Sequence, residues 1–327
     1  MPTARLGRFG WTAYLLVFLN ACATTGVREA ERIEEASGVA RRGESLLVVD
    51  DSAAGRFFEV PLQGTDSFFP LNRAGMRAVT VDQGSLALDL EGICLLADGR
   101  VVLLSERLCA LVGERGLVAS YEGMVSEFGR RGLEGVCARP LPDGSSRVAV
   151  LWEGGYPDAH FVPPTVKQCL GHSALQPFIL VHDLGRGAAN VKVHRRDLRQ
   201  QVTLDVPLPP GNEPDAQRFR APDLVWYRWP DKEDSWGFLV LISSQNSVER
   251  PEYLYHWLQR FDEEGRPVGN PLDLADYLPA SVKAANWEGL GWYEPGKQLA
   301  LVHEGEAGSP PHAFLLTLPE SWQTRLE

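Results

Sequence analysis

The chain has 327 residues, of which 44% are apolar and 23% are charged, and its formal net charge is −11. This composition is typical of a globular protein with a real core, and the length suits one large all-β domain or two ordinary domains. The acidity argues against nucleic acid as a partner, because nucleic-acid binding needs a basic surface that displaces phosphate counterions.

The N-terminal segment has the pattern of an export signal. Two arginines precede an apolar stretch over residues 11–19, which is too short to span a bilayer. Leu19-Asn20-Ala21-Cys22 follows and resembles a bacterial lipobox. The resemblance implies cleavage after residue 21, a lipid on Cys22 and attachment to an envelope membrane. Ala23 favours the outer membrane, at its periplasmic face or at the cell surface. An ordinary secretory peptide with an incidental cysteine is the alternative.

Residues 22–44 are predicted to be a lipidated tether. They are mostly small or charged, with several glutamates among arginines. Such a composition favours a solvated linker over a packed element, and a short solvated helix is the alternative. The folded domain is therefore expected to cover residues 45–327.

From residue 45 onward the chain alternates short apolar runs with turn sequences. Asp98-Gly99, Asp143-Gly144 and Pro295-Gly296 each separate two such runs, which is typical of β-hairpins. No stretch has a convincing helical pattern. The chain is therefore predicted to be all-β, with third strands over residues 178–182, 253–261 and 313–318.

An acidic motif begins several of these hairpins. Leu90-Glu91-Gly92-Ile93 recurs as Leu133-Glu134-Gly135-Val136 and as Trp287-Glu288-Gly289-Leu290, and Pro222-Asp223-Leu224-Val225 keeps the carboxylate without the glycine. The second run of each hairpin ends on polar residues that include Glu106, Glu153, Gln245 and Glu304.

The spacing of the motif predicts a radial architecture. Glu91 and Glu134 are 43 positions apart, and Asp223 follows Glu134 after 89 positions, about two such periods. A period near 40–45 residues with four strands per unit is the signature of propeller blades. The sequence therefore predicts a single β-propeller of about five or six blades, with two packed β-sandwiches as the alternative.

Strand starts of a propeller surround its central channel, so the repeated carboxylates are expected to converge there. Crowded like charges raise one another's pKa unless a cation neutralises them, and Ca²⁺ prefers six to eight oxygen ligands. Alternatively, each carboxylate accepts hydrogen bonds from neighbouring backbone amides as a structural staple. The predicted calcium ligands are Glu91, Glu106, Glu134, Glu153, Asp223 and Glu288.

These motifs resemble a known family. Asp89-Leu90-Glu91-Gly92-Ile93 with Leu103-Leu104-Ser105-Glu106-Arg107, and Asn286-Trp287-Glu288-Gly289-Leu290 with His303-Glu304, are similar to motifs of the phytase-like esterase and YjiK (SdiA-regulated) β-propellers. The resemblance implies calcium binding and, in some members, phosphoester hydrolysis. The chain lacks an Asp-Asp-Pro-Ala-like segment and an evident basic cluster, and this departure argues against hydrolysis of inositol phosphates.

Two functions follow as hypotheses, with a purely structural role in assembly as a third alternative. The first is a calcium-dependent hydrolase of phosphate or other esters, with Glu304 and His303 as candidate catalytic residues; a packed histidine is the alternative for His303. Arg107, Arg220 and Lys283 would bind an anionic substrate. The second is a non-catalytic module with structural calcium that binds a small anionic ligand or an envelope protein. A monomer is expected in either case.

Four further cysteines follow the tether, namely Cys94, Cys109, Cys137 and Cys169. In an exported chain they allow two disulfides in any of three pairings. Cys94 and Cys137 follow their repeat glutamates by three residues, so they are equally well explained as small buried residues on equivalent strands.

Overall fold

The structure is a computed structural model, and it describes residues 32–53, 55–64, 66–81, 88–121, 132–154, 176–207, 219–230, 235–245, 253–305 and 310–324. Contacts divide the chain into two units, residues 1–32 and 33–327, and every strand belongs to the second. The predicted signal peptide and Cys22 lie outside the described residues, as do Cys169 and His160. No helix among the described residues is long and apolar enough to cross a membrane.

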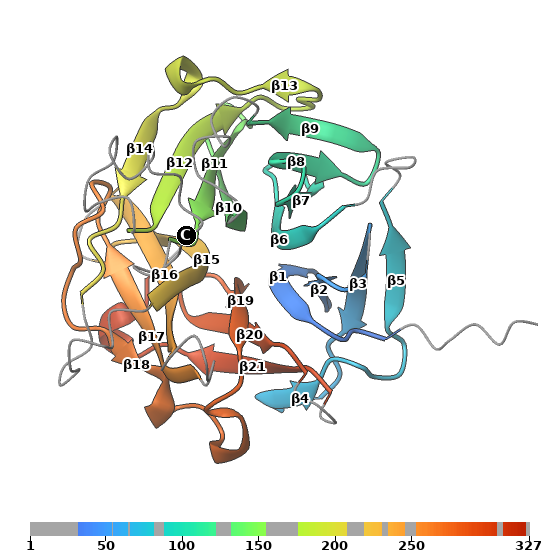
Figure 1. Cartoon of the computed structure of the whole chain (residues 1–327), viewed down its shortest axis with the longest axis vertical. Coiled ribbons are helices and arrows are strands. Elements are labelled where there is room, and N and C mark those ends of the chain that lie inside the picture. The colour runs from blue at the N-terminus through green and yellow to red at the C-terminus, as the bar shows by residue number, and fades with distance from the viewer. Residues whose placement is uncertain are drawn as a thin grey trace, which may run out of the picture. The chain divides into compact units, whose positions relative to one another are not determined.

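Five β-sheets are arranged radially, each with its innermost strand nearest the centre (Figure 1). Blade 1 comprises β1 (Ala36–Arg42), β2 (Ser45–Asp50), β3 (Arg56–Pro61) and β5 (Arg77–Thr80). Blade 2 comprises β6 (Leu90–Leu95), β7 (Val101–Ser105), β8 (Ala110–Gly113), β9 (Gly116–Ser120) and β13 (Val191–Lys192). Blade 3 comprises β10 (Leu133–Pro140), β11 (Ser146–Trp152), β12 (Phe178–Leu184) and β14 (Gln200–Thr203).

The remaining two blades complete the ring. Blade 4 comprises β15 (Phe219–Arg228), β16 (Trp236–Gln245), β17 (Tyr253–Phe261) and β18 (Leu272–Asp273). Blade 5 comprises β19 (Trp287–Glu294), β20 (Gln298–His303), β21 (His312–Thr317) and β4 (Phe68–Pro70). The helical elements in the described part are short 3₁₀ turns: η2 (Arg195–Asp197), η4 (Leu274–Asp276), η5 (Ala280–Val282) and η6 (Glu320–Trp322). The predicted all-β propeller is confirmed, and it has five blades.

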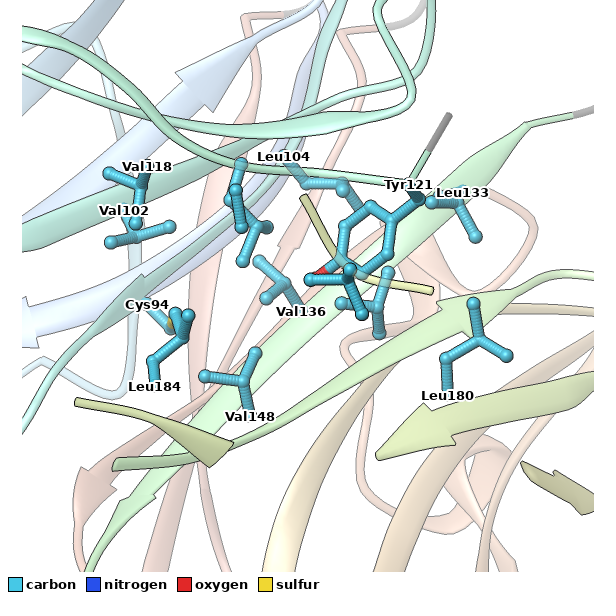
Figure 2. Packing of buried hydrophobic residues seen from close by; sticks show 14 of the residues in the cluster. Cys94, Val102, Leu104, Val118, Tyr121, Leu133, Val136, Val148, Leu180 and Leu184 are labelled. Carbon is cyan, nitrogen blue, oxygen red and sulfur yellow. The ribbon is translucent and has the colours of Figure 1, made fainter. Parts of the chain in front are cut away.

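A separate hydrophobic core lies between each pair of neighbouring blades. Alternating residues of a strand face the blade before it and the blade after it, so each blade contributes to two cores. Between blades 2 and 3, for example, Val102, Leu104 and Tyr121 belong to one buried cluster with Val136 and Val148 (Figure 2). Full burial of one such aliphatic side chain stabilises the fold by roughly 1.5–3 kcal/mol, which holds the blades in their radial order.

Two short strands leave their own blade and join a neighbour. β4 lies in the chain between β3 and β5 of blade 1, yet it pairs with β21 of blade 5. β13 follows β12 of blade 3 and pairs in parallel with β9 of blade 2. The first exchange joins the N-terminal blade to the C-terminal one, so it closes the ring with backbone hydrogen bonds.

The prediction of a tether up to residue 44 is wrong at its C-terminal end. Ala36–Arg42 form β1, the innermost strand of blade 1. Small residues fit this position because the innermost strands approach one another closely; a Cβ on Gly38 would lie 2.6 Å from the carbonyl oxygen of Glu91. The cysteines of the described part, Cys94, Cys109 and Cys137, are free thiols, and Cys94 and Cys137 are buried.

Candidate metal centre

The repeated glutamates occupy irregular positions on the innermost strands. Leu90 pairs with Ser105 and Gly92 with Leu104, so Glu91 is an extra residue in its ladder. The same interruption places Glu134 between Leu133 and Gly135 and Glu288 between Trp287 and Gly289. Such β-bulges re-aim a side chain away from the alternation of the strand. In blade 1 the equivalent residue is Ser37, whose hydroxyl donates to the carbonyl of Leu90 at 3.2 Å.

A second set of carboxylates follows the second strand of each of four blades, and consists of Asp51, Glu106, Glu153 and Glu304. The backbone N–H of Asp51 donates to the carbonyl of Glu35 at 3.0 Å, and that of Glu106 donates to the carbonyl of Asp89 at 2.9 Å. The N–H of Glu304 makes the equivalent bond to Asn286 at 3.1 Å. These bonds hold the second set beside the residues that precede the repeat motif.

The two sets form one acidic cluster, in which carboxylates of both sets raise the pKa of their neighbours. Burial, and then Asp51, Glu288, Glu106 and Asp89, raise the pKa of Glu91 to about 10. Glu91 itself is only 8% exposed. The structure therefore brings Glu91, Glu106 and Glu288 together as the sequence indicates.

Glu134 and Glu153 belong to the same cluster. The pKa of Glu134 is raised well above its ordinary value by burial, and then by Glu153, Glu91 and Glu106. The carboxylate of Glu106 also accepts a hydrogen bond from the backbone N–H of Gly132, which begins the next blade.

Three carboxylates of blades 1 and 2 are close enough to share one ion. One oxygen each from Asp51, Asp89 and Glu91 lie within 4.8 Å of one another. Oxygens that bind the same Ca²⁺ at about 2.3–2.6 Å can be at most roughly 5 Å apart, so this spacing fits. The side chain of Asp89 hydrogen-bonds that of Asp51, and burial followed by this bond raises the pKa of Asp51 to about 7. Within the described part of the chain, the Glu91 carboxylate has no hydrogen-bond donor or cation beside it.

Arg220 supplies a positive charge on another side of the cluster. Arg220 lies near the start of β15 in blade 4, and its Nη2 contacts Glu288 and the side-chain oxygen of Asn286. Its Nη1 lies 3.7 Å from the carboxylate of Glu153. Asn286 also donates to Glu288 at 2.6 Å. The guanidinium is thus held by acidic partners and offsets part of the negative charge on this side of the cluster.

Asp223 lies at a different level from the glutamates. It pairs with Leu241 of β16, and the next residue, Leu224, lines the same cavity as Ile93, Val136 and Leu290, which each follow a repeat glycine. Asp223 therefore stands where the other motifs have glycine, and a Cβ on Gly135 would come within 2.9 Å of its Cα.

Its carboxylate accepts hydrogen bonds from backbone amides of three blades. Leu224 and Leu290 each donate at 2.8 Å, and Val136 donates as well. Burial raises the pKa of Asp223 well above its ordinary value, while these three amides favour the ionised form. Asp223 therefore has the contacts expected of the alternative to a calcium ligand, a carboxylate that accepts hydrogen bonds from neighbouring backbone amides.

The structure places the ring of His303 against two aromatic rings of blade 5, and its Nδ1 beside the carbonyl oxygen of Glu304. Its ring packs edge-on against Trp287 at 4.8 Å and stacks on His312 at 5.6 Å, and only 1% of it is exposed. Burial lowers the pKa of His303 to about 4. These are the surroundings expected of a packed histidine, the alternative to a catalytic one.

Glu304, the next residue, does join the acidic cluster. Burial, and then Glu288, raise its pKa to about 7. Arg107 and Lys283 are exposed, and neither forms an ion pair or hydrogen bond with the described residues. Sequence reasoning therefore identified most of the cluster but missed Asp51, Asp89 and Asn286 as members. Their signal was position, since each lies next to a repeat motif or at the end of a second strand.

The sequence matches no protein-family model and no curated protein. Among solved structures, the chain is similar to a gluconolactonase from Xanthomonas campestris (14% identity, 88% of this chain and 87% of that one, TM-score 0.38). It is also similar to the calcium-binding protein regucalcin from Agrobacterium tumefaciens (9%, 90% and 95%, 0.39) and to virginiamycin B lyase from Staphylococcus aureus (9%, 88% and 96%, 0.39). Likenesses at this level carry no conclusion about activity.

Proposed function

We propose that the acidic end of the propeller binds a calcium ion between Asp51, Asp89 and Glu91, and that the protein uses this centre to hydrolyse an ester. The observation that supports it is the group of three carboxylates from two blades whose oxygens lie within 4.8 Å of one another. A buried carboxylate surrounded by other carboxylates is costly unless a cation is present.

The residues fit a hard divalent cation. All three proposed ligands offer oxygen, and two further carboxylates, Glu106 and Glu288, raise the pKa of Glu91 and so lie near it. Calcium prefers such all-oxygen sites, whereas transition metals favour imidazole or thiolate. Histidine and cysteine are absent from this group of ligands.

The remaining residues of the cluster supply acid–base chemistry. Calcium, when bound, would polarise the ester and favour ionisation of water beside it. Glu304 is the proposed general base, because its pKa of about 7 lets it accept a proton near neutral pH. Arg220 and Asn286 hold Glu288, the neighbour that keeps this pKa raised.

The balance of charge indicates the class of ester. Among the described residues the cluster holds at least eight carboxylates: Asp51, Asp89, Glu91, Glu106, Glu134, Glu153, Glu288 and Glu304. Arg220 and one calcium ion leave it negative, which disfavours a dianionic phosphate monoester. We therefore propose an uncharged ester as the substrate, with phosphate esters as the competing class.

The test is turnover by full-length protein from which metal has been stripped. Aryl esters and aryl phosphates are assayed with calcium added back, and Glu304→Gln and Glu91→Gln are compared with the wild type. We expect calcium-dependent cleavage of the uncharged esters that both substitutions abolish. Calcium binding without turnover on either panel would overturn the enzymatic proposal and leave the binding module with structural calcium.

A further inference from the structure

The cavity lined by Ile93, Val136, Leu224 and Leu290 is formed by the innermost strands, one residue beyond the repeat glycines. It has a volume of about 450 Å³, and all five innermost strands contribute to its wall. Most of the lining is aliphatic, and Trp226, Trp292 and Tyr293 add aromatic surface. The cavity is within the range of small-molecule sites, which are about 300–1,000 Å³ and mainly apolar.

The order of residues along the strands separates this cavity from the metal centre. On β6 the sequence runs from Glu91 through Gly92 to the cavity-lining Ile93, and β10 and β19 repeat that order. At the glycine level the strands are in tight backbone contact; a Cβ on Gly92 would lie 3.0 Å from the carbonyl oxygen of Glu134. The axis therefore has charged groups at one level, close-packed backbone at the next, and an apolar cavity beyond.

The rim of the cavity is held in place and carries a cation. Arg41 donates to the carbonyls of Gly43 and Tyr293 at 2.9 and 2.6 Å, and its guanidinium lies 4.5 Å from the centre of the Tyr293 ring. The indole N–H of Trp292 donates to the carbonyl of Trp226 at 3.0 Å. Within the described residues, the acidic partner of Arg41 is Glu44, 4.0 Å away and 90% exposed. Such an exposed pair contributes little, so an anion at the rim could replace it.

We propose that this cavity binds a small amphipathic anion, with an aromatic or short branched body in the apolar wall and a carboxylate at Arg41. A small molecule is favoured over a protein segment because the volume fits one ring system or a short acyl chain. The aromatic wall residues suit a flat body, and Arg41 can bind two carboxylate oxygens. This site is independent of the proposed calcium centre.

The probe is 2-naphthoate, compared with the uncharged 2-naphthalenemethanol, each titrated into full-length protein with tryptophan fluorescence as the readout. We expect saturable binding of both, with naphthoate the tighter. Ala138→Leu, which adds bulk to the lining, should weaken both probes by at least ~10-fold, since an overfilled cavity excludes them. The exposed Ala74→Leu is the matched control and should leave both affinities unchanged.

A second variant keeps the test decisive if Ala138→Leu does not fold. Arg41→Gln should reduce the preference for naphthoate over the alcohol by ~5-fold or more and leave binding of the alcohol nearly unchanged. Absence of saturable binding by the wild type would overturn the proposal. So would equal affinities in Ala138→Leu and Ala74→Leu, or an unchanged preference in Arg41→Gln.

Discussion

Glu91 and Asp223 are both buried carboxylates near the axis of the propeller, and the two have opposite surroundings. Asp223 is 3% exposed and receives N–H groups from three backbone amides. Glu91 is 8% exposed and has four other carboxylates as its electrostatic neighbours. The fold supplies hydrogen bonds to Asp223, whereas among the described residues Glu91 has none.

This difference separates a structural acid from a ligand. Removing a buried carboxylate that has its own donors leaves backbone amides unpaired, which lowers the stability of the folded state. A buried carboxylate without donors destabilises the folded state until a cation binds. The donors beside each side chain therefore distinguish Asp223, whose hydrogen bonds join three blades, from Glu91, the proposed calcium ligand.

The largest expected effect is on stability, in Asp223→Ala. Three backbone amides from blades 3, 4 and 5 would lose their acceptor, which we expect to cost about 3–5 kcal/mol of the free energy of unfolding. Denaturant titration in the presence of chelator measures this loss. Calcium affinity should change by less than ~3-fold. A loss of calcium binding in a variant that remains folded would show that Asp223 is a ligand after all.

The converse is expected of Glu91→Gln. Calcium affinity should fall at least ~100-fold, because a charged ligand is lost from a site that depends on carboxylates. The melting temperature in chelator should rise near neutral pH, since the folded state no longer has to hold a proton on a side chain that is ionised in the unfolded chain. Calorimetry and thermal melts measure the two effects, with Glu59→Gln, a half-buried glutamate of β3 paired with Arg42 and Arg77, as the control for affinity. A lower metal-free stability of Glu91→Gln would mean that Glu91, like Asp223, stabilises the fold through hydrogen bonds.

Metal-free protein should lose stability as the pH rises. The folded-state pKa values of Asp51 and Glu304, about 7, and of Glu91, about 10, lie above their ordinary values of 3.8 and 4.5. The folded state therefore holds protons that the unfolded state has released, and stability falls from about pH 4 upward through these values. Melting temperatures in chelator should be lower at pH 8 than at pH 5.5, and calcium should raise them more at pH 8. A melting temperature that rises with pH in chelator would contradict the raised pKa values of these carboxylates.

Arg220→Gln is expected to strengthen calcium binding by ~3–10-fold, because a cation within the cluster repels the ion. The same change should lower metal-free stability, since Glu153 and Glu288 lose their ion pair. Arg107→Gln, an exposed arginine that follows Glu106, is the matched control. Weaker calcium binding in Arg220→Gln alone would mean that the arginine orients the ligands rather than opposing the charge of the ion.

The smallest effect is expected for His303→Gln. The ring of His303 lies between Trp287 and His312, so ester turnover per folded molecule should stay within ~2-fold of the wild type. Steady-state kinetics, normalised to the concentration of folded protein, measures this turnover. A large loss of turnover with unchanged stability would restore His303 as a catalytic residue.

The sequence contained enough to predict the fold, because the Glu-Gly motif and the hairpin turns repeat with the blades. Blade 1 was missed at its innermost strand, where Ser37-Gly38-Val39 replaces the acidic motif. Small and charged residues look like a linker when read alone. What makes them a strand is contact with the innermost strands of blades 2 and 5, distant in the sequence, and such contacts leave no local pattern.

The site was predicted as a ring of equivalent carboxylates, and the structure divides it. Asp223 was aligned with the glutamates by residue type, although strand register places it with the glycines. β1 is the innermost strand of blade 1, which makes β2 the second strand and gives Asp51 the position that Glu106 has in blade 2. Because β1 was not predicted, this equivalence was not visible in the sequence. Residue type thus predicted an acidic cluster, and strand register decided which carboxylates belong to it.

The most direct measurement is a crystal structure of the full-length protein grown with calcium, with terbium in its place to locate the ion by anomalous scattering. The account predicts one ion within about 2.3–2.6 Å of oxygens from Asp51, Asp89 and Glu91. It further predicts that Asp223 keeps its backbone amides. An ion bound by Asp223, or by Glu134 and Glu153 without the three predicted ligands, would contradict it.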